Sequence, residues 1–281
     1  MDTASRSDSV RGGGGATGGY IATTAGYTAV QDGRALRITI TNPKRKNALD
    51  YDTMAGLGDT VLAASQDPAV RVIVLTGEGG DFCAGADLAA APGEKERGIT
   101  PEMTMDVANR MIKAIVDSPV PVIARVKGAA AGVGVAFALA ADLAYASEDA
   151  YLLLAFVNIG LMPDGGAAAL VAAAAGRPLA AEMALLGERL PARKAVEHSL
   201  IAGAYSDEEL DAKVEAAVAK LAHGPRRALE LTKRALNTAA LTSLDAALAA
   251  EKAGQCELLG SADFAEGAAA MLQKRRAVFA E

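Results

Sequence analysis

Two stretches of the sequence share one pattern, in which a short apolar run is followed at once by a cluster of glycine and alanine. The first run, at residues 70–76, reads VRVIVLT and leads into GEGGDFCAGADL at residues 77–88. The second, at residues 121–126, reads PVIARV and leads into GAAAGVGVAFALA at residues 128–140. Runs rich in β-branched apolar residues predict strands buried in a sheet. The small residues that follow let the backbone approach another group closely.

The second cluster is also expected to open a helix. Backbone N–H groups at the start of a helix have no partner inside the helix and point outward. Two turns that each donate one N–H to the same point form an oxyanion hole, which stabilises negative charge on a substrate oxygen. The two clusters therefore predict a site of this kind.

From residue 27 the pattern alternates between strands and helices, which predicts an α/β fold. Strands are expected at 28–30, 35–41, 70–76, 121–126 and 143–146, and helices at 51–65, at 103–117 and in the second small-residue cluster. Asp32-Gly33 is a turn dipeptide between two expected strands, and Asp50 is suited to cap the helix that follows it.

The C-terminal part has a different character, because no strand pattern follows residue 205. Helices are expected at 207–222, 226–238, 243–259 and 264–279. Gly224-Pro225 has the order that ends one helix and begins the next. We therefore divide the chain into an N-terminal arm at residues 1–19, a core at 20–205 and a C-terminal helical region at 206–281.

Composition limits the classes of function. The 281 residues are 51% hydrophobic, include no tryptophan and carry a net charge of −6. This favours a globular protein with a large core and argues against general nucleic-acid binding. Cys83 and Cys256 are far apart in sequence and lack metal-ligand spacing, which favours a reduced, cytoplasmic protein without a metal site. We interpret Cys83 as a packing residue.

Residues 1–19 are rich in serine, glycine and aspartate and lack the apolar centre of a secretory signal. We expect a disordered arm there. The most apolar stretches, residues 128–141 and 167–175, are shorter than the roughly 18 residues that a membrane-spanning helix needs. No membrane span is therefore expected.

Five motifs together resemble those of the enoyl-CoA hydratase/isomerase family, the crotonases. They are NPKRKNAL at 42–49, FCAGADL at 82–88, KGAAAGVGVAFALAADLAYAS at 127–147, IGLMPDGG at 159–166 and DFAEGAAAMLQKR at 263–275. Their order and spacing over about residues 27–279 carry the resemblance. It implies a spiral of repeated strand–strand–helix turns, and a C-terminal helical region that forms trimers, commonly paired into hexamers. It also implies chemistry on an acyl-CoA or enoyl-CoA thioester through an enolate, with coenzyme A as part of the substrate and no other cofactor.

The resemblance also assigns the backbone donors and the coenzyme A contacts. It implies that the N–H groups of Ala86 and Val133 form the oxyanion hole, where many family members have glycine at the second position. Basic residues are implied at coenzyme A, where cations meet phosphates; a solvated charged face is the alternative for each of them. These residues are Lys44, Arg45 and Lys46, and Lys274 at the position of a residue that reaches coenzyme A from a neighbouring subunit.

The remaining substrate contacts implied by the resemblance are Ala48, Ala84, Asp87, Leu88, Gly134, Ala136 and Phe156. For Asp87 a cap or turn role is the preferred interpretation. Arg125 and Lys127 are interpreted as structural or solvated, and His198 and His223 lie outside the motifs.

The acid and base residues depart from the hydratase pattern. Hydratases of the family use two glutamates, and the aligned positions here are Ala136 and Phe156, neither of which can move a proton. Asp164 remains, either as the N-cap of a helix that runs to about residue 174 or as a single base that shuttles a proton along the acyl chain. The sequence thus leaves two hypotheses, an isomerase-type enzyme that uses Asp164 and a non-catalytic acyl-CoA-binding homologue.

Overall fold

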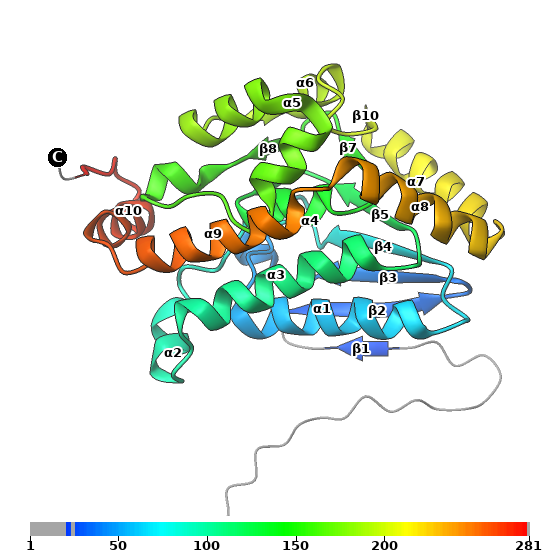
Figure 1. The fold of residues 1–281 in the computed structure, drawn as a ribbon, viewed down its shortest axis with the longest axis horizontal. Coiled ribbons are helices and arrows are strands. Elements are labelled where there is room, and N and C mark those ends of the chain that lie inside the picture. The colour runs from blue at the N-terminus through cyan, green and yellow to red at the C-terminus, as the bar shows by residue number, and fades with distance from the viewer. Residues whose placement is uncertain (1–20, 24–25, 280–281) are drawn as a thin grey trace, which may run out of the picture.

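A seven-stranded sheet forms the centre of the computed structural model, which describes residues 21–23 and 26–279 (Figure 1). The arm expected at residues 1–19 lies outside the described residues. The strand order is β1-β2-β3-β4-β5-β7-β10; β1 to β3 pair antiparallel and β3 to β10 pair parallel. The strands are β1 (Ile21–Thr23), β2 (Tyr27–Asp32), β3 (Ala35–Ile40), β4 (Val72–Gly77), β5 (Val122–Val126), β7 (Leu143–Ser147) and β10 (Gly203–Tyr205).

A second, three-stranded sheet has the order β6-β8-β9 and lies close to the ends of the parallel strands. It is formed by β6 (Ala129–Ala131), β8 (Tyr151–Leu153) and β9 (Leu190–Pro191). The succession β5, β6, α4 (Val133–Leu139) is followed by β7, β8, α5 (Ala167–Leu186). This is the repeated strand–strand–helix turn of the predicted spiral, so the fold class is confirmed.

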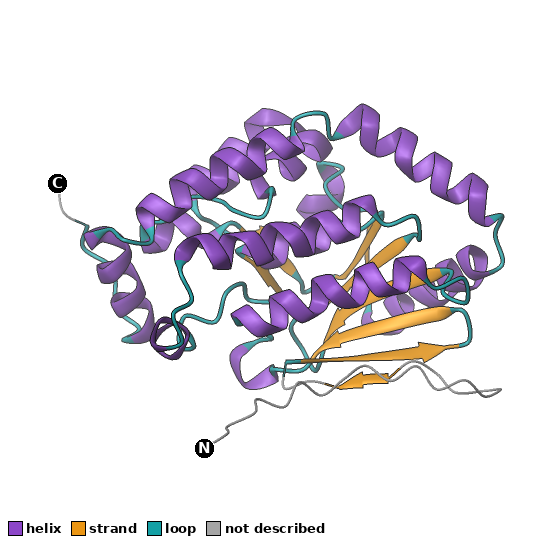
Figure 2. Cartoon of the chain, turned by 60° about the horizontal axis from the view of Figure 1, so that its bottom comes forward, coloured by secondary structure: helices purple, strands orange, loops and turns teal. Residues whose placement is uncertain are grey.

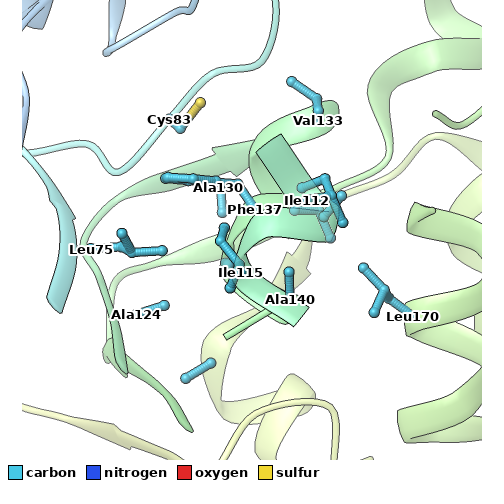
Figure 3. Packing of buried hydrophobic residues seen from close by; sticks show 14 of the residues in the cluster. Leu75, Cys83, Ile112, Ile115, Ala124, Ala130, Val133, Phe137, Ala140 and Leu170 are labelled. Carbon is cyan, nitrogen blue, oxygen red and sulfur yellow. The ribbon is translucent and has the colours of Figure 1, made fainter. Parts of the chain in front are cut away.

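The first face of the large sheet is covered by α1 (Tyr51–Gln66), α3 (Pro101–Asp117) and α4, as Figure 2 shows for the helices in front of the strands. The helix start at Asp50 is confirmed, because its side chain accepts a hydrogen bond of 2.8 Å from Thr53 N. The main core lies between this helical layer and the sheet, with Leu75, Ile112, Ile115 and Phe137 in close packing (Figure 3).

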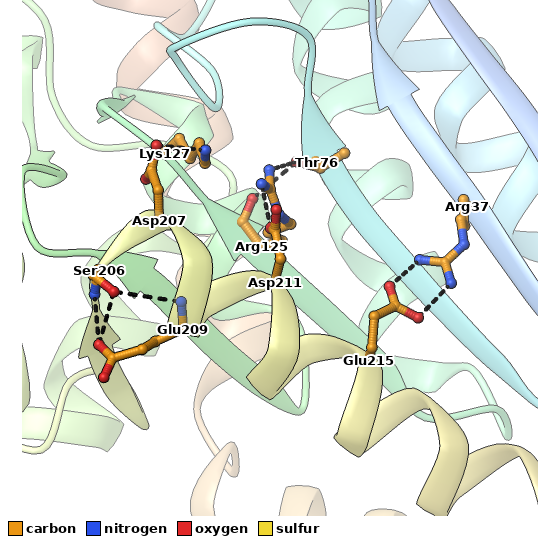
Figure 4. Close-up of polar contacts among 9 residues, drawn as sticks. All are labelled: Arg37, Thr76, Arg125, Lys127, Ser206, Asp207, Glu209, Asp211 and Glu215. Carbon is orange, nitrogen blue, oxygen red and sulfur yellow. Dashed lines mark hydrogen bonds and ion pairs between the residues drawn. The ribbon is translucent and has the colours of Figure 1, made fainter.

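The opposite face of the sheet is covered by α7 (Asp207–Ala222), which packs Leu210 and Val214 into a second, smaller core. Three acidic side chains, four residues apart on α7, form ion pairs with bases from the sheet (Figure 4). The pairs are Asp207–Lys127 at 2.8 Å, Asp211–Arg125 at 2.5 Å and Glu215–Arg37 at 2.8 Å. Arg125 and Lys127 are therefore structural, as the sequence predicted.

The C-terminal helices α8 (Arg226–Ala240), α9 (Leu244–Leu258) and α10 (Ala262–Leu272) run back across the core helices (Figure 1). The last helix was expected to continue to residue 279, and this was wrong. Lys274 adopts a left-handed conformation, with φ of 55°. Lys274 N and Arg275 N then donate to Met271 O and Ala270 O, which satisfies the last carbonyl groups of α10 and ends it.

The remaining helices are short or interrupted. They are the 3₁₀ helices η1 (Pro43–Arg45) and η2 (Ala155–Ile159), together with α2 (Ala91–Glu96) and α6 (Ala192–Glu197). By length and composition α5 alone among the described helices would allow a membrane span. Gly176 is non-helical, however, with φ of 82° and ψ of 161°, and it divides α5 into two segments that are each shorter than about 20 residues.

The buried side chain of Lys233 fastens α8 to the core. Its Nζ donates to the carbonyl oxygens of Ile115, at 2.8 Å, and Val120, at 3.4 Å. It also lies 2.9 Å from the Asp142 carboxylate, which accepts a second hydrogen bond from Val122 N. The buried ammonium group therefore has a partner for each of its three protons.

We predict that Lys233→Met lowers the free energy of unfolding by about 3–5 kcal/mol, because it leaves the Asp142 carboxylate and two carbonyl groups buried without their partner. Urea denaturation measures the change. Arg234→Met is the matched control, since Arg234 is exposed and pairs only with Glu230 on the surface, so that a change within about 0.5 kcal/mol is expected. Equal losses in the two variants would contradict the role assigned to Lys233.

Candidate functional site

A cavity of about 400 Å³ lies between the two small-residue turns and the C-terminal helices. The turn at residues 84–88, the start of α4, η2, α9 and α10 all contribute to its wall. Most of the lining is apolar and comes from Leu88, Met105, Val133, Phe156, Ile159, Leu161, Leu259, Ala270 and Met271. Polar side chains are few, with Thr104, Asn158, Asp164, Gln255 and Arg275 at the wall.

The two small-residue turns are held together by backbone contacts. Cys83 and Ala130 form a parallel bridge, in which Cys83 N donates to Ala129 O and Ala131 N donates to Cys83 O. Gly85 and Gly132 then lie directly against each other, and both have positive φ, of 97° and 55°. A Cβ atom on Gly85 would lie 3.0 Å from Ala131 O. Glycine is therefore required where the turns meet.

These two glycines precede the predicted N–H donors, Ala86 and Val133. Leu49 N donates to Gly85 O, and Asp87 N donates to Leu49 O, so Leu49 bonds to both neighbours of Ala86 and the Ala86 N–H points away from it. Val133 is the first residue of α4, where an N–H has no acceptor within the helix. Neither N–H donates to an acceptor in the described part of the chain, and both residues line the cavity.

Asp164 lies in the loop before α5 and reaches the same cavity. Its Oδ2 accepts a hydrogen bond of 2.9 Å from Gln255 Nε2. Its Oδ1 is buried and accepts no hydrogen bond from the described residues. Burial raises the pKa of Asp164 to about 6, while the hydrogen bond from Gln255 opposes the rise. A carboxyl group with these properties is ready to accept a proton from a molecule in the cavity.

The alternative role of Asp164 as an N-cap is wrong. The first residue of α5 is Ala167 and its cap position is Gly166. The N–H groups of Gly166 and Ala168 donate instead to the carboxylate of Glu251, at 2.6 and 3.2 Å. Burial raises the pKa of Glu251 to about 7, which the nearby Asp164 also favours. The two glycines after Asp164 let the loop turn before the helix begins, so a carboxylate from α9 takes the capping role.

Both positions that align with the hydratase glutamates carry apolar side chains, and neither places a polar group in the cavity. Ala136 is fully buried in α4 and does not line the cavity, although it packs close to Gly165. Phe156 lies in η2 and lines the cavity, with its ring about 3.8 Å from the place where a Cβ on Gly132 would lie. An apolar ring therefore covers the second backbone turn.

Six of the residues assigned from the sequence line the cavity, and eight lie outside its wall. Those in its wall are Ala84, Ala86, Leu88, Val133, Phe156 and Asp164. Ala48, Asp87, Gly134 and Ala136 support the wall from behind. Asp87 is a turn residue, since its Oδ1 accepts a hydrogen bond from Ala89 N. Gly134 packs on Cys83, whose carbonyl oxygen would lie 2.4 Å from a Cβ at that position.

The four basic residues assigned to coenzyme A lie outside the described wall of the cavity. Lys44, Arg45, Lys46 and Lys274 are all exposed. Arg45 lies 3.4 Å from Asp87, beside the turn at residues 84–88, and Lys46 lies 3.1 Å from Asp81. The loop that carries Lys44, Arg45 and Lys46 is thus next to the first backbone turn, at residues 84–88.

Sequence reasoning missed the contribution of α9 and α10 to the site. Gln255 and Glu251 are four residues apart on one face of α9, and a polar pair within a helix rich in alanine and leucine is a signal for burial with a partner. Arg275 also lines the cavity, but its guanidinium is bound to Glu266 through two hydrogen bonds of 2.5 and 2.7 Å. Among residues 21–23 and 26–279, no three His, Cys, Asp or Glu side chains are grouped to hold a metal ion.

Comparison with known families agrees with this fold and cavity. Residues 32–281 match the model of the family described as enoyl-CoA hydratase/isomerase. The chain therefore belongs to the enoyl-CoA hydratase/isomerase family, which acts on acyl-CoA thioesters.

Individual relatives cover nearly the whole chain. The 1,2-epoxyphenylacetyl-CoA isomerase of Escherichia coli K12 is 35% identical over 87% of this chain and 94% of its own. A probable enoyl-CoA hydratase of Rhodobacter capsulatus is 38% identical over 88% and 94%. The crystal structure of an enoyl-CoA hydratase from Mycobacterium avium subsp. paratuberculosis is 42% identical, with a TM-score of 0.85 over 92% of this chain and 100% of that one.

We predict that Asp164→Asn stabilises the protein at pH 7.5 by at most about 3 kcal/mol, because one pKa unit corresponds to about 1.4 kcal/mol. The pKa of Asp164 is raised in the folded state, so ionising its carboxyl opposes folding. This cost is absent well below the ordinary pKa of 3.8, grows as the pH rises from there to about 6, and is complete above it. Asparagine keeps an acceptor for Gln255 and carries no charge.

Urea denaturation of both proteins at pH 7.5 and pH 4.5 measures the effect. The variant is expected to gain stability at pH 7.5 and little at pH 4.5. An equal difference at the two pH values would show that ionisation of Asp164 is not responsible.

Proposed function

We propose that this protein moves the double bond of a 3-enoyl-CoA to give the 2-enoyl-CoA. The observation that carries the proposal is the carboxyl of Asp164, whose Oδ1 accepts no hydrogen bond from the described residues. It lies in an apolar cavity whose wall also holds two N–H groups without an acceptor in the same part of the chain. Coenzyme A enters as part of the substrate, and the exposed bases Lys44, Arg45 and Lys46 beside the first turn are suited to its phosphates.

In this proposal the thioester carbonyl accepts hydrogen bonds from Ala86 N and Val133 N. Asp164 removes a proton from the α-carbon, and the electrons move onto the carbonyl oxygen to give a dienolate. The same carboxyl then returns the proton to the γ-carbon, which leaves the double bond conjugated with the thioester. Each N–H donor of an oxyanion hole is typically worth about 3–4 kcal/mol in the transition state, which makes one carboxylate a sufficient base.

The choice of isomerisation over hydration depends on Ala136 and Phe156. Hydration needs a water that is oriented and deprotonated, and then a proton delivered to carbon. Neither side chain can do this, and the ring of Phe156 lies over the second turn. Relatives have both kinds of name, since one is called an isomerase and another a 2,3-dehydroadipyl-CoA hydratase. The absence of two acids in this chain favours the first kind.

We predict that Asp164→Asn abolishes migration of the double bond from 3-enoyl-CoA to 2-enoyl-CoA, while affinity for acyl-CoA changes little. In the parent protein kcat/KM is expected to rise with pH and to level off above about pH 6, because the base must be ionised and burial sets its pKa near that value. Absorbance of the conjugated thioester measures the rate. A variant that isomerises at the parent rate removes Asp164 from the mechanism.

A second prediction concerns water addition. General acid–base groups typically contribute about 10²–10⁴-fold each, so the absence of both glutamates predicts negligible hydration of a short 2-enoyl-CoA. Loss of thioester absorbance, with the product identified by mass spectrometry, measures it. Hydration at a rate comparable to isomerisation would show that the roles given to Ala136 and Phe156 are wrong.

The alternative function is acyl-CoA binding without turnover. It is favoured if calorimetry detects tight acyl-CoA binding, weak binding of the matched free acid, and no product from a panel of enoyl-CoA thioesters. Equal or absent binding of acyl-CoA and free acid would instead exclude both functions for this cavity.

We also propose that the chain assembles as a trimer or hexamer through its C-terminal helical region and α5. Large apolar side chains are exposed there in a single chain: Leu185 is 72% exposed, Leu186 58% and Leu236 64%. Such side chains on several helices favour burial against another copy. Light scattering at micromolar protein is expected to give the mass of three or six chains. The mass of one chain would contradict the assembly.

A further inference from the structure

Two polar residues on α9 hold the loop that carries Asp164. Gln255 Nε2 donates to Asp164 Oδ2 at 2.9 Å, and Gln255 Oε1 accepts from Met162 N at 3.3 Å. Glu251 accepts from Gly166 N at 2.6 Å and from Ala168 N at 3.2 Å. Side chains on one face of α9 therefore hold this loop at Asp164 and on both sides of it.

We propose that Gln255 is a positioning residue for Asp164, and that Glu251 holds the same loop through the N–H groups of Gly166 and Ala168. The proposal rests on the function proposed above, in which Asp164 transfers the proton. Gln255 occupies Oδ2 and leaves Oδ1 without a hydrogen bond from the described residues. No contact with the reacting carbon is required of either α9 side chain.

The orientation of the Gln255 amide follows from its partners. Met162 N–H can only donate, so the amide oxygen must face Met162 and the NH₂ group must face Asp164. Gln255 is 1% exposed and Glu251 is 3% exposed. Burying polar groups is costly unless they are hydrogen-bonded. The hydrogen bonds that these two side chains form within the described residues all go to residues 162–168.

The two residues differ in their effect on the Asp164 carboxyl. A hydrogen bond donated by Gln255 favours the ionised carboxylate, and it lowers the pKa of Asp164. Asp164 raises the pKa of Glu251 as a like charge, and Glu251, with a pKa of about 7, is still mostly protonated when Asp164 ionises near pH 6. Removing Gln255 should thus move the ionisation of Asp164 to higher pH, whereas replacing Glu251 by a neutral residue should move it little.

Few other charged groups face Asp164. The neighbouring segments of α4 and η2, VGVAFAL and AFVNI, contain no titratable side chain, and the buried face of α3 presents Met105 and Ile112. Arg275 lines the same cavity but is paired with Glu266. Within the described residues Glu251 is therefore the charged group coupled to Asp164.

The test compares Gln255→Leu and Glu251→Gln with the parent, and uses Glu257→Gln as the matched control, because Glu257 is an exposed acid on the same helix. Two readouts are used. The first is kcat and KM for a 3-enoyl-CoA between pH 4.5 and pH 8.5. The second is infrared titration of the Asp164 carboxyl, obtained as the difference between each protein and its own Asp164→Asn partner, which needs no turnover.

Gln255→Leu is expected to move the titration and the rise of kcat to higher pH by about one unit, since the lost hydrogen bond was made to a charged group. Its kcat should fall roughly tenfold with KM within about twofold, because the carboxyl is no longer held. Glu251→Gln keeps an acceptor for Gly166 N and is expected to leave the titration of Asp164 close to that of the parent, because Glu251 is mostly protonated when Asp164 ionises. Glu257→Gln should move neither.

An unchanged titration in Gln255→Leu, or an equal shift in Gln255→Leu and Glu251→Gln, overturns the positioning role. If Gln255→Leu fails to fold, Gln255→Met replaces it. The unbranched methionine side chain adapts to the same space and donates no hydrogen bond to Asp164, so the titration again moves to higher pH. A parent that titrates and shifts as expected but isomerises nothing leaves the positioning intact and refutes the proposed function.

Discussion

The close approach of two backbone turns is the constraint on which the site depends. Gly85 and Gly132 lie against each other because β6 pairs with the Cys83 segment. The N–H groups of the next residues are left without acceptors among the residues that the structure describes. A side chain at either glycine would meet the opposite turn. Gly134 extends the constraint into α4, where only a missing Cβ lets the helix pack on Cys83. The part of the cavity wall where the two turns meet is thus formed by backbone atoms that packing holds in place.

The strands and long helices of the core were predictable because their periodicity is strong and local. The apolar face of α3, with Met105, Met111 and Ile115, is buried as its spacing indicates. The three-residue strands β6 and β8 were not predicted, since AAA and YLL carry little strand signal and pair only because the spiral brings them together. The end of α10 was missed for a related reason, because Lys274 takes a left-handed conformation that glycine usually supplies.

The residues predicted from the backbone turns line one cavity, whereas those from distant segments were missed. Ala86, Val133 and Asp164 reach one cavity, as the motifs indicated. The partner of Asp164 could not be found from the sequence, because Gln255 is 91 residues further along the chain. The capping role given to Asp164 was wrong for the same reason, since Glu251 supplies the acceptor from α9. The local sequence pattern predicts the turn, but tertiary packing decides which side chain forms hydrogen bonds with it.

Because α10 docks on η2, the two ends of the cavity are formed by different parts of the chain. Gly267 lies so close to Ile159 that a Cβ would be 2.5 Å from its Cα, and the next turn of α10 supplies Ala270 and Met271 to the wall. The end nearest the backbone turns belongs to the spiral, whereas this far end belongs to the last helix. In the function proposed above, substitutions in α10 would therefore reshape the space for the tail of an acyl group while the atoms that face the thioester stay in place. Selectivity for the acyl group and the chemistry at the thioester are in this way free to evolve independently.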